Sequence, residues 1–117
     1  MSELKIFHNP RCSKSRQTLK ILNEKGLLPH IIEYLKTPIN AQELKLIINQ
    51  LGFSSPRQLM RKGEDAYKQQ NLADISLTED SLISAMLSTP KLIERPIVIF
   101  NGKAAIGRPP ESILDIL

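Results

Sequence analysis

The sequence has 117 residues, which is enough for one typical domain and too few for a second independent core. Hydrophobic residues make up 41% and charged residues 24%, and these values exclude an intrinsically disordered or collagen-like chain. No apolar stretch approaches the ~20 residues that span a bilayer, and the N-terminus lacks the pattern of a secretory signal. The single cysteine cannot form an internal disulfide. We therefore expect a cytoplasmic protein with no membrane partner.

The positive charge could attract nucleic acid or a small anion, and the aromatic content bears on the first of these. Sixteen basic residues against twelve acidic ones give a net charge of +4. The basic residues are dispersed, as on a solvated surface, and the aromatic content of 4% without tryptophan leaves no stacking platform for single-stranded nucleic acid. We expect no nucleic-acid partner, and a small anion is the remaining class that the excess positive charge would attract.

The first third of the chain predicts a βαβ unit. Residues 4–8 form an apolar strand that Pro10 ends, and a helix follows over about 13–25, with Gly26 as its C-terminal stop. Residues 31–35 read as a second strand. Two strands joined by a helix are expected to be parallel, with a right-handed crossover.

The middle of the chain predicts helices. Asn40 with a glutamate three residues later is typical of a capping box, and the helix that follows ends at Gly52. Ser55 caps another helix, which is expected to run to about residue 62. A short helix over about 64–71 and one capped by Thr78 complete this block.

The end of the chain returns to β-structure. Residues 97–100 and 103–106 read as strands, and the Asn101-Gly102 pair between them predicts a type I′ hairpin turn. A last helix is expected to begin at the two prolines 109 and 110.

Together these elements predict an α/β fold with a four-stranded mixed sheet covered by helices. The helical block of about 40–90 is too tightly connected to fold separately, so we expect it to be an insertion between the second and third strands. Residues 1–117 then form a single domain.

Cys12 is the candidate nucleophile because it lies between the end of a strand and the start of a helix. Free backbone N–H groups and the positive end of the helix dipole favour a thiolate at such a position. Arg11, Lys14 and Arg16 add positive charge, and His8 could add more. Ser15, one turn along the helix, could donate its hydroxyl to the sulfur. The same N–H groups could bind a tetrahedral oxyanion against the sulfur.

Two common motifs are not met around this cysteine. A redox Cys-x-x-Cys pair would need a second cysteine at position 15, which is a serine. A phosphatase loop needs Cys-x5-Arg, whereas Arg16 follows Cys12 after three residues and would lie within the helix. A reducing thiol must therefore come from another molecule.

Three arginines distant in sequence are candidate oxyanion ligands. Arg95 precedes Pro96, where a cis bond would place a turn beside the end of the first strand, and Arg108 follows the predicted hairpin. Both lie at strand termini, where a guanidinium fork could clamp an oxyanion. Arg61 could join them from the insertion, although it could equally be a surface helix residue.

Several stretches together resemble one known family. They are His8-Asn9-Pro10, Cys12-x-x-Ser15-Arg16, Leu59-Met60-Arg61-Lys62, Glu94-Arg95-Pro96-Ile97-Val98, Gly107-Arg108-Pro109 and the closing Leu114-Asp115-Ile116-Leu117. The combination resembles the glutaredoxin-linked arsenate reductases of the ArsC type, and the length resembles their short, YfgD-like branch. The resemblance implies a thioredoxin-like fold with a helical insertion and a cis-proline at position 96.

The resemblance also implies roles for six residues: Cys12 as nucleophile, Arg61, Arg95 and Arg108 holding arsenate, and His8 and Ser15 stabilising the thiolate. It implies glutathione as a co-substrate and a glutaredoxin that resolves the mixed disulfide, with no metal and no bound cofactor. Arsenate and phosphate share shape and charge, so the physiological oxyanion stays open.

Two other functions remain alternatives. A transcription regulator of the Spx type shares this fold and binds RNA polymerase, although such regulators typically carry Cys-x-x-Cys. A glutathione-dependent thiol oxidoreductase acting on protein mixed disulfides fits the Cys12-x-x-Ser15 pattern.

Overall fold

The computed structural model describes residues 4–37 and 39–117. The chain divides into two compact units, which we describe separately. The first comprises residues 4–37 and 95–117, and the second comprises residues 39–94. The second unit lies in the sequence between two strands of the first, where the helical insertion is predicted. That residues 1–117 fold as a single domain stays a prediction.

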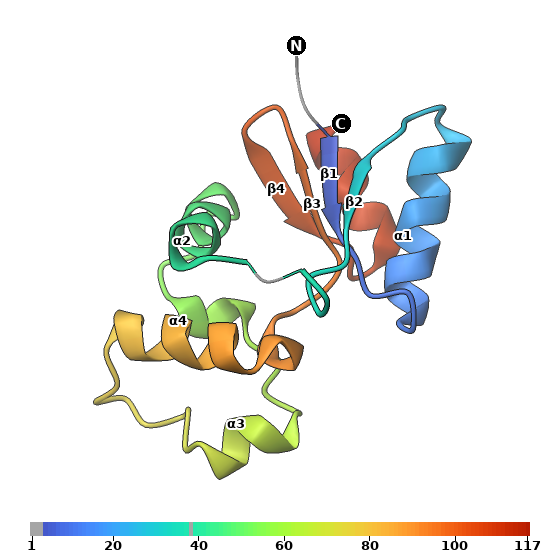
Figure 1. Cartoon of the computed structure of the whole chain (residues 1–117). Helices are drawn as coiled ribbons and strands as arrows, with labels where there is room; N and C mark the ends of the chain where they lie inside the picture. The colour runs from blue at the N-terminus through green and yellow to red at the C-terminus, as the bar shows by residue number, and fades with distance from the viewer. Residues whose placement is uncertain (1–3, 38) are drawn as a thin grey trace. The chain divides into compact units, whose positions relative to one another are not determined.

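The first unit contains a four-stranded sheet in the order β2-β1-β3-β4 (Figure 1). Its strands are β1 (Leu4–Phe7), β2 (His30–Ile32), β3 (Ile97–Phe100) and β4 (Lys103–Ile106). β1 is parallel to β2 and antiparallel to β3, and β3 is antiparallel to β4. The predicted mixed sheet with a parallel βαβ unit is thus confirmed.

The register of the strands gathers three chain segments at one end of the sheet. Phe7, the last residue of β1, pairs with Ile97, the first residue of β3. Ile97 also pairs with Ile106, the last residue of β4. The segments that follow β1, precede β3 and follow β4 therefore meet at this end, as the sequence predicts for the first two.

The predicted hairpin turn is confirmed by its backbone angles. Asn101 has φ 55° and Gly102 has φ 78°. A type I′ turn requires positive φ at both central residues, which asparagine and glycine adopt most readily.

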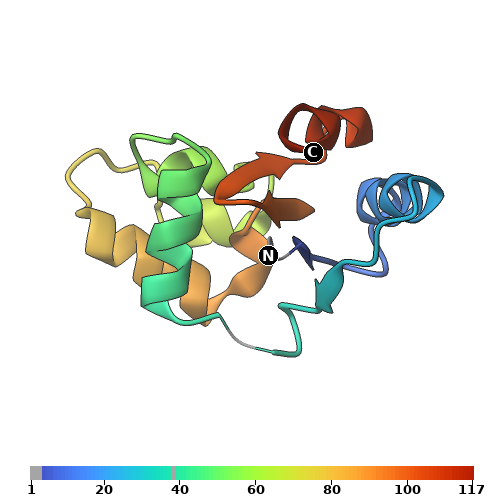
Figure 2. The same cartoon turned by 90° about the horizontal axis from the view of Figure 1, so that it is seen from above.

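Two helical segments cover one face of the sheet. α1 (Ser13–Glu24) and the C-terminal 3₁₀ segment η3 (Pro110–Ile116) lie on the same side in Figure 2. They enclose a core that comprises Leu4, Ile6, Leu22, Val98 and Ile113. Because alternate residues of a strand share a face, the next residue on this face after Leu4 and Ile6 is His8.

Three predicted elements differ from the structure. The second strand ends at Ile32 instead of residue 35, because the Glu33 carbonyl accepts the turn hydrogen bonds of Lys36 and Thr37. The last helix is a 3₁₀ segment, the form that short helical pieces often adopt. The helix predicted to reach residue 62 is the 3₁₀ segment η1 (Pro56–Leu59), because Met60 is extended and forms a bridge with Ile93.

The second unit is helical, as predicted. Its elements are α2 (Ala41–Gln50), η1, α3 (Asp65–Gln69), α4 (Glu79–Ser88) and η2 (Pro90–Leu92). The side chains of Asn40 and Thr78 accept hydrogen bonds from Glu43 N and Ser81 N, which confirms both as N-caps.

Gly107 leads to the first testable prediction. A Cβ atom added there would overlap Thr18 Oγ1 and lie 2.8 Å from Pro96 Cγ. Thr18 is fully buried, so neither neighbour can move freely. We expect Gly107→Ala to lower the free energy of unfolding by about 1–3 kcal/mol, as measured by urea denaturation.

Gly63 provides the matched control for this substitution. A Cβ atom on Gly63 would meet nothing within 4 Å, and its φ is not in the left-handed region. Gly63→Ala is expected to leave the unfolding midpoint unchanged or slightly raised. Equal midpoints for the two variants would contradict the close approach inferred at Gly107.

Candidate active site

Cys12 is the N-cap residue of α1. Its backbone is extended, with φ −93° and ψ 123°, and its carbonyl accepts the first helical hydrogen bond from Arg16 N at 3.0 Å. The loop before it is closed by Cys12 N donating to Asn9 O, also at 3.0 Å. The half-buried thiol therefore lies at the positive end of a twelve-residue helix whose first turn contains no acidic residue. This environment favours an anion at the sulfur or beside it.

Arg108 joins Cys12 to the segment before β3. Its Nη2 atom donates to Cys12 Sγ at 3.5 Å, and its Nε atom donates to the Arg95 carbonyl at 2.8 Å. The Arg95 carbonyl thus holds the guanidinium through Nε, while Nη2 of the same group contacts the sulfur. Such a fork stabilises a thiolate and is oriented toward a negative group bound there.

Arg95 and Arg108 each precede a proline in a cis peptide bond. The Arg95–Pro96 bond is cis, which confirms the prediction at Pro96, and Arg108–Pro109 is also cis, which the sequence analysis does not anticipate. Gly107 N donates to the Pro96 carbonyl at 3.0 Å, so the two arginine segments run side by side.

His8, Ser15 and Asn9 form a second group beside the cysteine. His8 Nδ1 lies 2.6 Å from Ser15 Oγ, and Asn9 N donates to the same Oγ at 3.0 Å. Because Ser15 Oγ accepts from Asn9, its hydroxyl hydrogen is available to donate to His8 Nδ1. No hydrogen bond joins Ser15 to Cys12 within the described part of the chain, so the side-chain partner of the Ser15 hydroxyl is His8 and not the sulfur.

The His8 side chain is buried, and its charge state follows from that. Burial lowers the pKa of His8, the Glu33 carboxylate opposes the shift, and the Arg16 guanidinium adds to it. A lowered pKa favours the neutral imidazole, which argues against His8 as a source of positive charge beside Cys12. The role that the resemblance assigns to His8 and Ser15 stays a prediction.

The lowered pKa of His8 predicts a pH dependence of stability. The unfolded chain binds the His8 proton with a pKa near 6.5, more readily than the folded chain does. The free energy of unfolding should therefore be unaffected above pH 6.5 and should fall as the pH drops from there through the folded pKa. Urea denaturation at a series of pH values between 7.5 and 5 checks this.

Two substitutions test whether His8, and not another titrating group, causes this pH dependence of stability. His8→Asn keeps an acceptor for Ser15 but has no group that titrates in this range. In this variant the free energy of unfolding should therefore no longer fall as the pH drops below 6.5. His30→Asn, at an exposed histidine of β2, should retain this decrease. Asp74, whose pKa the Ser76 backbone and hydroxyl hold below its usual range, titrates outside this window. An identical decrease in both variants would refute the assignment to His8.

Arg61 lies in the second unit. Its Nη1 atom is 2.9 Å from Glu64 Oε1 and its Nε atom 3.5 Å from Glu94 Oε1. Arg61 follows η1 and is not a surface helix residue, because its backbone N donates to the Leu92 carbonyl at 2.7 Å. Its part in oxyanion binding stays a prediction.

Three further residues, which were not predicted from the sequence, shape the site. Asn9 accepts from Arg11 N through its side chain and donates to Ser15 through its backbone. The Asn-Pro pair was the available signal, because asparagine commonly forms such turns. Thr18 and Gly107 form the close approach described above, and no local pattern indicates that they meet.

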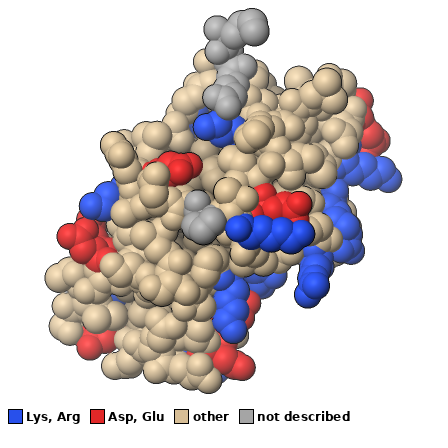
Figure 3. Space-filling model, in the orientation of Figure 1, with Lys and Arg blue, Asp and Glu red and all other residues tan. Residues whose placement is uncertain are grey.

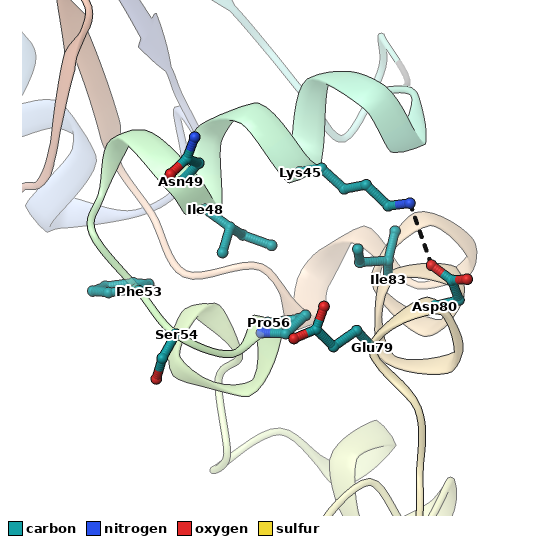
Figure 4. Close-up of a pocket in the computed structure, with 9 residues that line it drawn as sticks. All are labelled: Lys45, Ile48, Asn49, Phe53, Ser54, Pro56, Glu79, Asp80 and Ile83. Atoms are coloured by element: carbon teal, nitrogen blue, oxygen red, sulfur yellow. Dashed lines mark ion pairs between the residues drawn. The ribbon is translucent and has the colours of Figure 1, made fainter.

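The second unit contains a pocket of about 300 Å³ between α2 and α4 (Figure 4). Ile48, Ile83 and Pro56 line it, and Lys45 pairs with Asp80 across one side at 3.3 Å. None of the predicted site residues lines this pocket.

Among residues 4–37 and 39–117, no group of three or more histidine, cysteine or acidic side chains could hold a metal ion. Within the same residues, no helix has the length and apolar character needed to cross a bilayer.

The sequence is similar to a known family and to several known proteins. A family model described as the ArsC family matches residues 7–116. A protein of Escherichia coli K12, "Uncharacterized protein YfgD", is 56% identical over 98% of this chain and 97% of its own length. An arsenate reductase of Neisseria meningitidis serogroup A (strain Z2491) is 50% identical over the full length of both chains.

The solved structures extend the likeness to three dimensions. An arsenate reductase from Vibrio cholerae superposes with a TM-score of 0.96 and 50% identity, covering 98% of each chain. The first unit accordingly has a thioredoxin-like sheet, interrupted in sequence by the helical insertion. The contact of Arg108 with the one cysteine, at the N-terminus of α1, is consistent with these matches. Because the family model spans nearly all of the chain, this chain belongs to the ArsC family.

Proposed function

We propose that this protein is an arsenate reductase that uses Cys12 as its nucleophile and glutathione as its reductant. The observation that carries the proposal is the donation from Arg108 Nη2 to Cys12 Sγ at the N-terminus of α1. The guanidinium and the free N–H groups of the helix could hold a tetrahedral oxyanion against a thiolate. The names of several relatives support arsenate as that oxyanion, over the alternative of a transcription regulator.

The first proposed step forms a covalent adduct. The Cys12 thiolate attacks As(V), an As–S bond forms, and one As–O bond breaks. The departing oxygen takes up protons and leaves as water. Arg95 and Arg108 would balance the negative charge of the oxyanion.

The second step transfers the electrons. A glutathione thiolate attacks the sulfur of Cys12, and the electron pair of the S–As bond goes to arsenic. Arsenic is reduced to As(III) and leaves as arsenite, while Cys12 and glutathione are oxidised to a mixed disulfide. Cys12 is the only cysteine in the sequence, so a second, external thiol must break this disulfide. A glutaredoxin in a reducing cytoplasm would supply it.

A coupled assay tests the proposal. NADPH oxidation is followed with glutathione, glutathione reductase, a glutaredoxin and arsenate, and arsenite is measured directly. We expect oxidation to require all of these components and to match arsenite formation. Phosphate in place of arsenate should support none, because thiols do not reduce it. NADPH oxidation with a mixed-disulfide substrate but no arsenite from arsenate would favour the thiol oxidoreductase instead.

A further inference from the structure

Basic side chains recur from the loop before α1 through the eighth of the twelve residues of this helix. We define the α1 basic surface as Arg11, Lys14, Arg16 and Lys20, all of which are exposed. In Figure 3 the Lys and Arg side chains gather over α1. The twelve residues of α1 include one acidic residue, Glu24, which is the last. Positive side chains at the positive end of a helix are unfavourable for the helix itself, so local stability does not account for them.

These charges also lack partners. Within the described chain, Arg11, Lys14 and Lys20 form no ion pair, and Arg16 donates to the Pro10 carbonyl at 3.0 Å. Two exposed lysines elsewhere in the described structure, Lys36 and Lys45, do pair with carboxylates. The α1 basic surface is therefore a region of uncompensated positive charge, and it begins at the residue beside Cys12.

We propose that the α1 basic surface is the docking site for the acidic face of the thiol protein that reduces the Cys12 mixed disulfide. This inference rests on the proposed function. Cys12 is half-buried and caps α1, so a protein thiol that reaches it must lie against neighbouring surface. A small thiol needs no such contact. Opposite charges on the two faces would raise the encounter rate and orient the partner.

A protein fits this surface better than a nucleic acid does. The surface adjoins the only thiol of the chain, whose regeneration requires another thiol. Its four residues include no aromatic side chain that could stack on a base. The partner's thiolate attacks the glutathione sulfur, the bond to Cys12 breaks, and Cys12 leaves as a thiolate. The partner then holds glutathione as a mixed disulfide, so no net electrons are needed from elsewhere.

The test measures this one step without arsenate. Oxidised glutathione modifies the single cysteine of the full-length protein, and stopped-flow mixing follows its reduction by a reduced, negatively charged glutaredoxin. Lys20→Glu is compared with Lys103→Glu, which changes the charge equally. Lys103 is exposed and pairs with Phe100, at the opposite end of the sheet from the Phe7–Ile97 pair. Dithiothreitol, which has no protein surface that could dock, serves as the small reductant.

We expect Lys20→Glu to slow reduction by glutaredoxin about threefold at low salt. The loss should shrink as salt is raised, because screening weakens the attraction. Lys103→Glu should match the unmodified sequence, and all variants should react alike with dithiothreitol.

Equal rates for Lys20→Glu and Lys103→Glu, or a loss independent of salt, would overturn the docking site. So would a DNA duplex that binds through these residues while the glutaredoxin rate stays unchanged. Because the disulfide is formed with glutathione, a protein that fails to reduce arsenate can still pass this test. The failure of the proposed function is thereby distinguished from the failure of the docking site.

Discussion

Replacing Cys12 with serine is expected to abolish arsenate reduction, with a loss of more than about 10³-fold in turnover. A serine hydroxyl is not ionised at neutral pH, and its oxygen cannot form the disulfide that the second step requires. The coupled NADPH assay and direct measurement of arsenite are the readouts. The loss should persist at any concentration of glutathione, because glutathione acts after the adduct forms.

The variant should fold normally. Cys12 is half-buried, and its sulfur is one atom of an N-cap that makes no side-chain capping hydrogen bond. Its urea midpoint should therefore lie close to that of the parent protein. A folded Cys12→Ser protein that still converts arsenate to arsenite at a substantial rate would exclude Cys12 as the nucleophile.

Replacing Arg108 with lysine is expected to lower kcat/KM for arsenate about 10²-fold. The guanidinium makes two separate hydrogen bonds, one to the Arg95 carbonyl and one to Cys12 Sγ. A lysine amine keeps the charge but cannot reproduce the fixed fork that spans both. The rate at which iodoacetamide alkylates Cys12 should fall as well. This rate measures the reactivity of the sulfur without arsenate, and so reports the lost contact with Arg108 directly.

Arg57 provides a matched control for this substitution. Its Nε atom donates to the Leu72 carbonyl at 3.0 Å and its Nη2 atom to the Asp74 carbonyl at 2.9 Å, so it is also a fork held by the backbone. Arg57→Lys should lower stability and leave kcat/KM and the alkylation rate unchanged. Equal losses of activity in both variants would show that Arg108 acts only through the fold.

Much of the fold follows from short stretches of sequence. Asn40 and Thr78 cap the helices that they were expected to cap, and Asn101-Gly102 forms the expected turn. Each of these features depends on residues within a few positions and on backbone sterics. One error arises where a distant segment intervenes, because Met60 pairs with Ile93 and ends a helical segment early.

The sequence by itself determined that the only cysteine lies between a strand and a helix, and that arginines lie at strand ends. It did so because hydrophobic periodicity and caps are local signals. Only the tertiary structure decided that Arg108, 96 residues away, contacts Cys12, and that Ser15 is hydrogen-bonded to His8. It alone also decided the direction in which the pKa of His8 shifts, since burial disfavours the charged imidazole and burial is a property of packing.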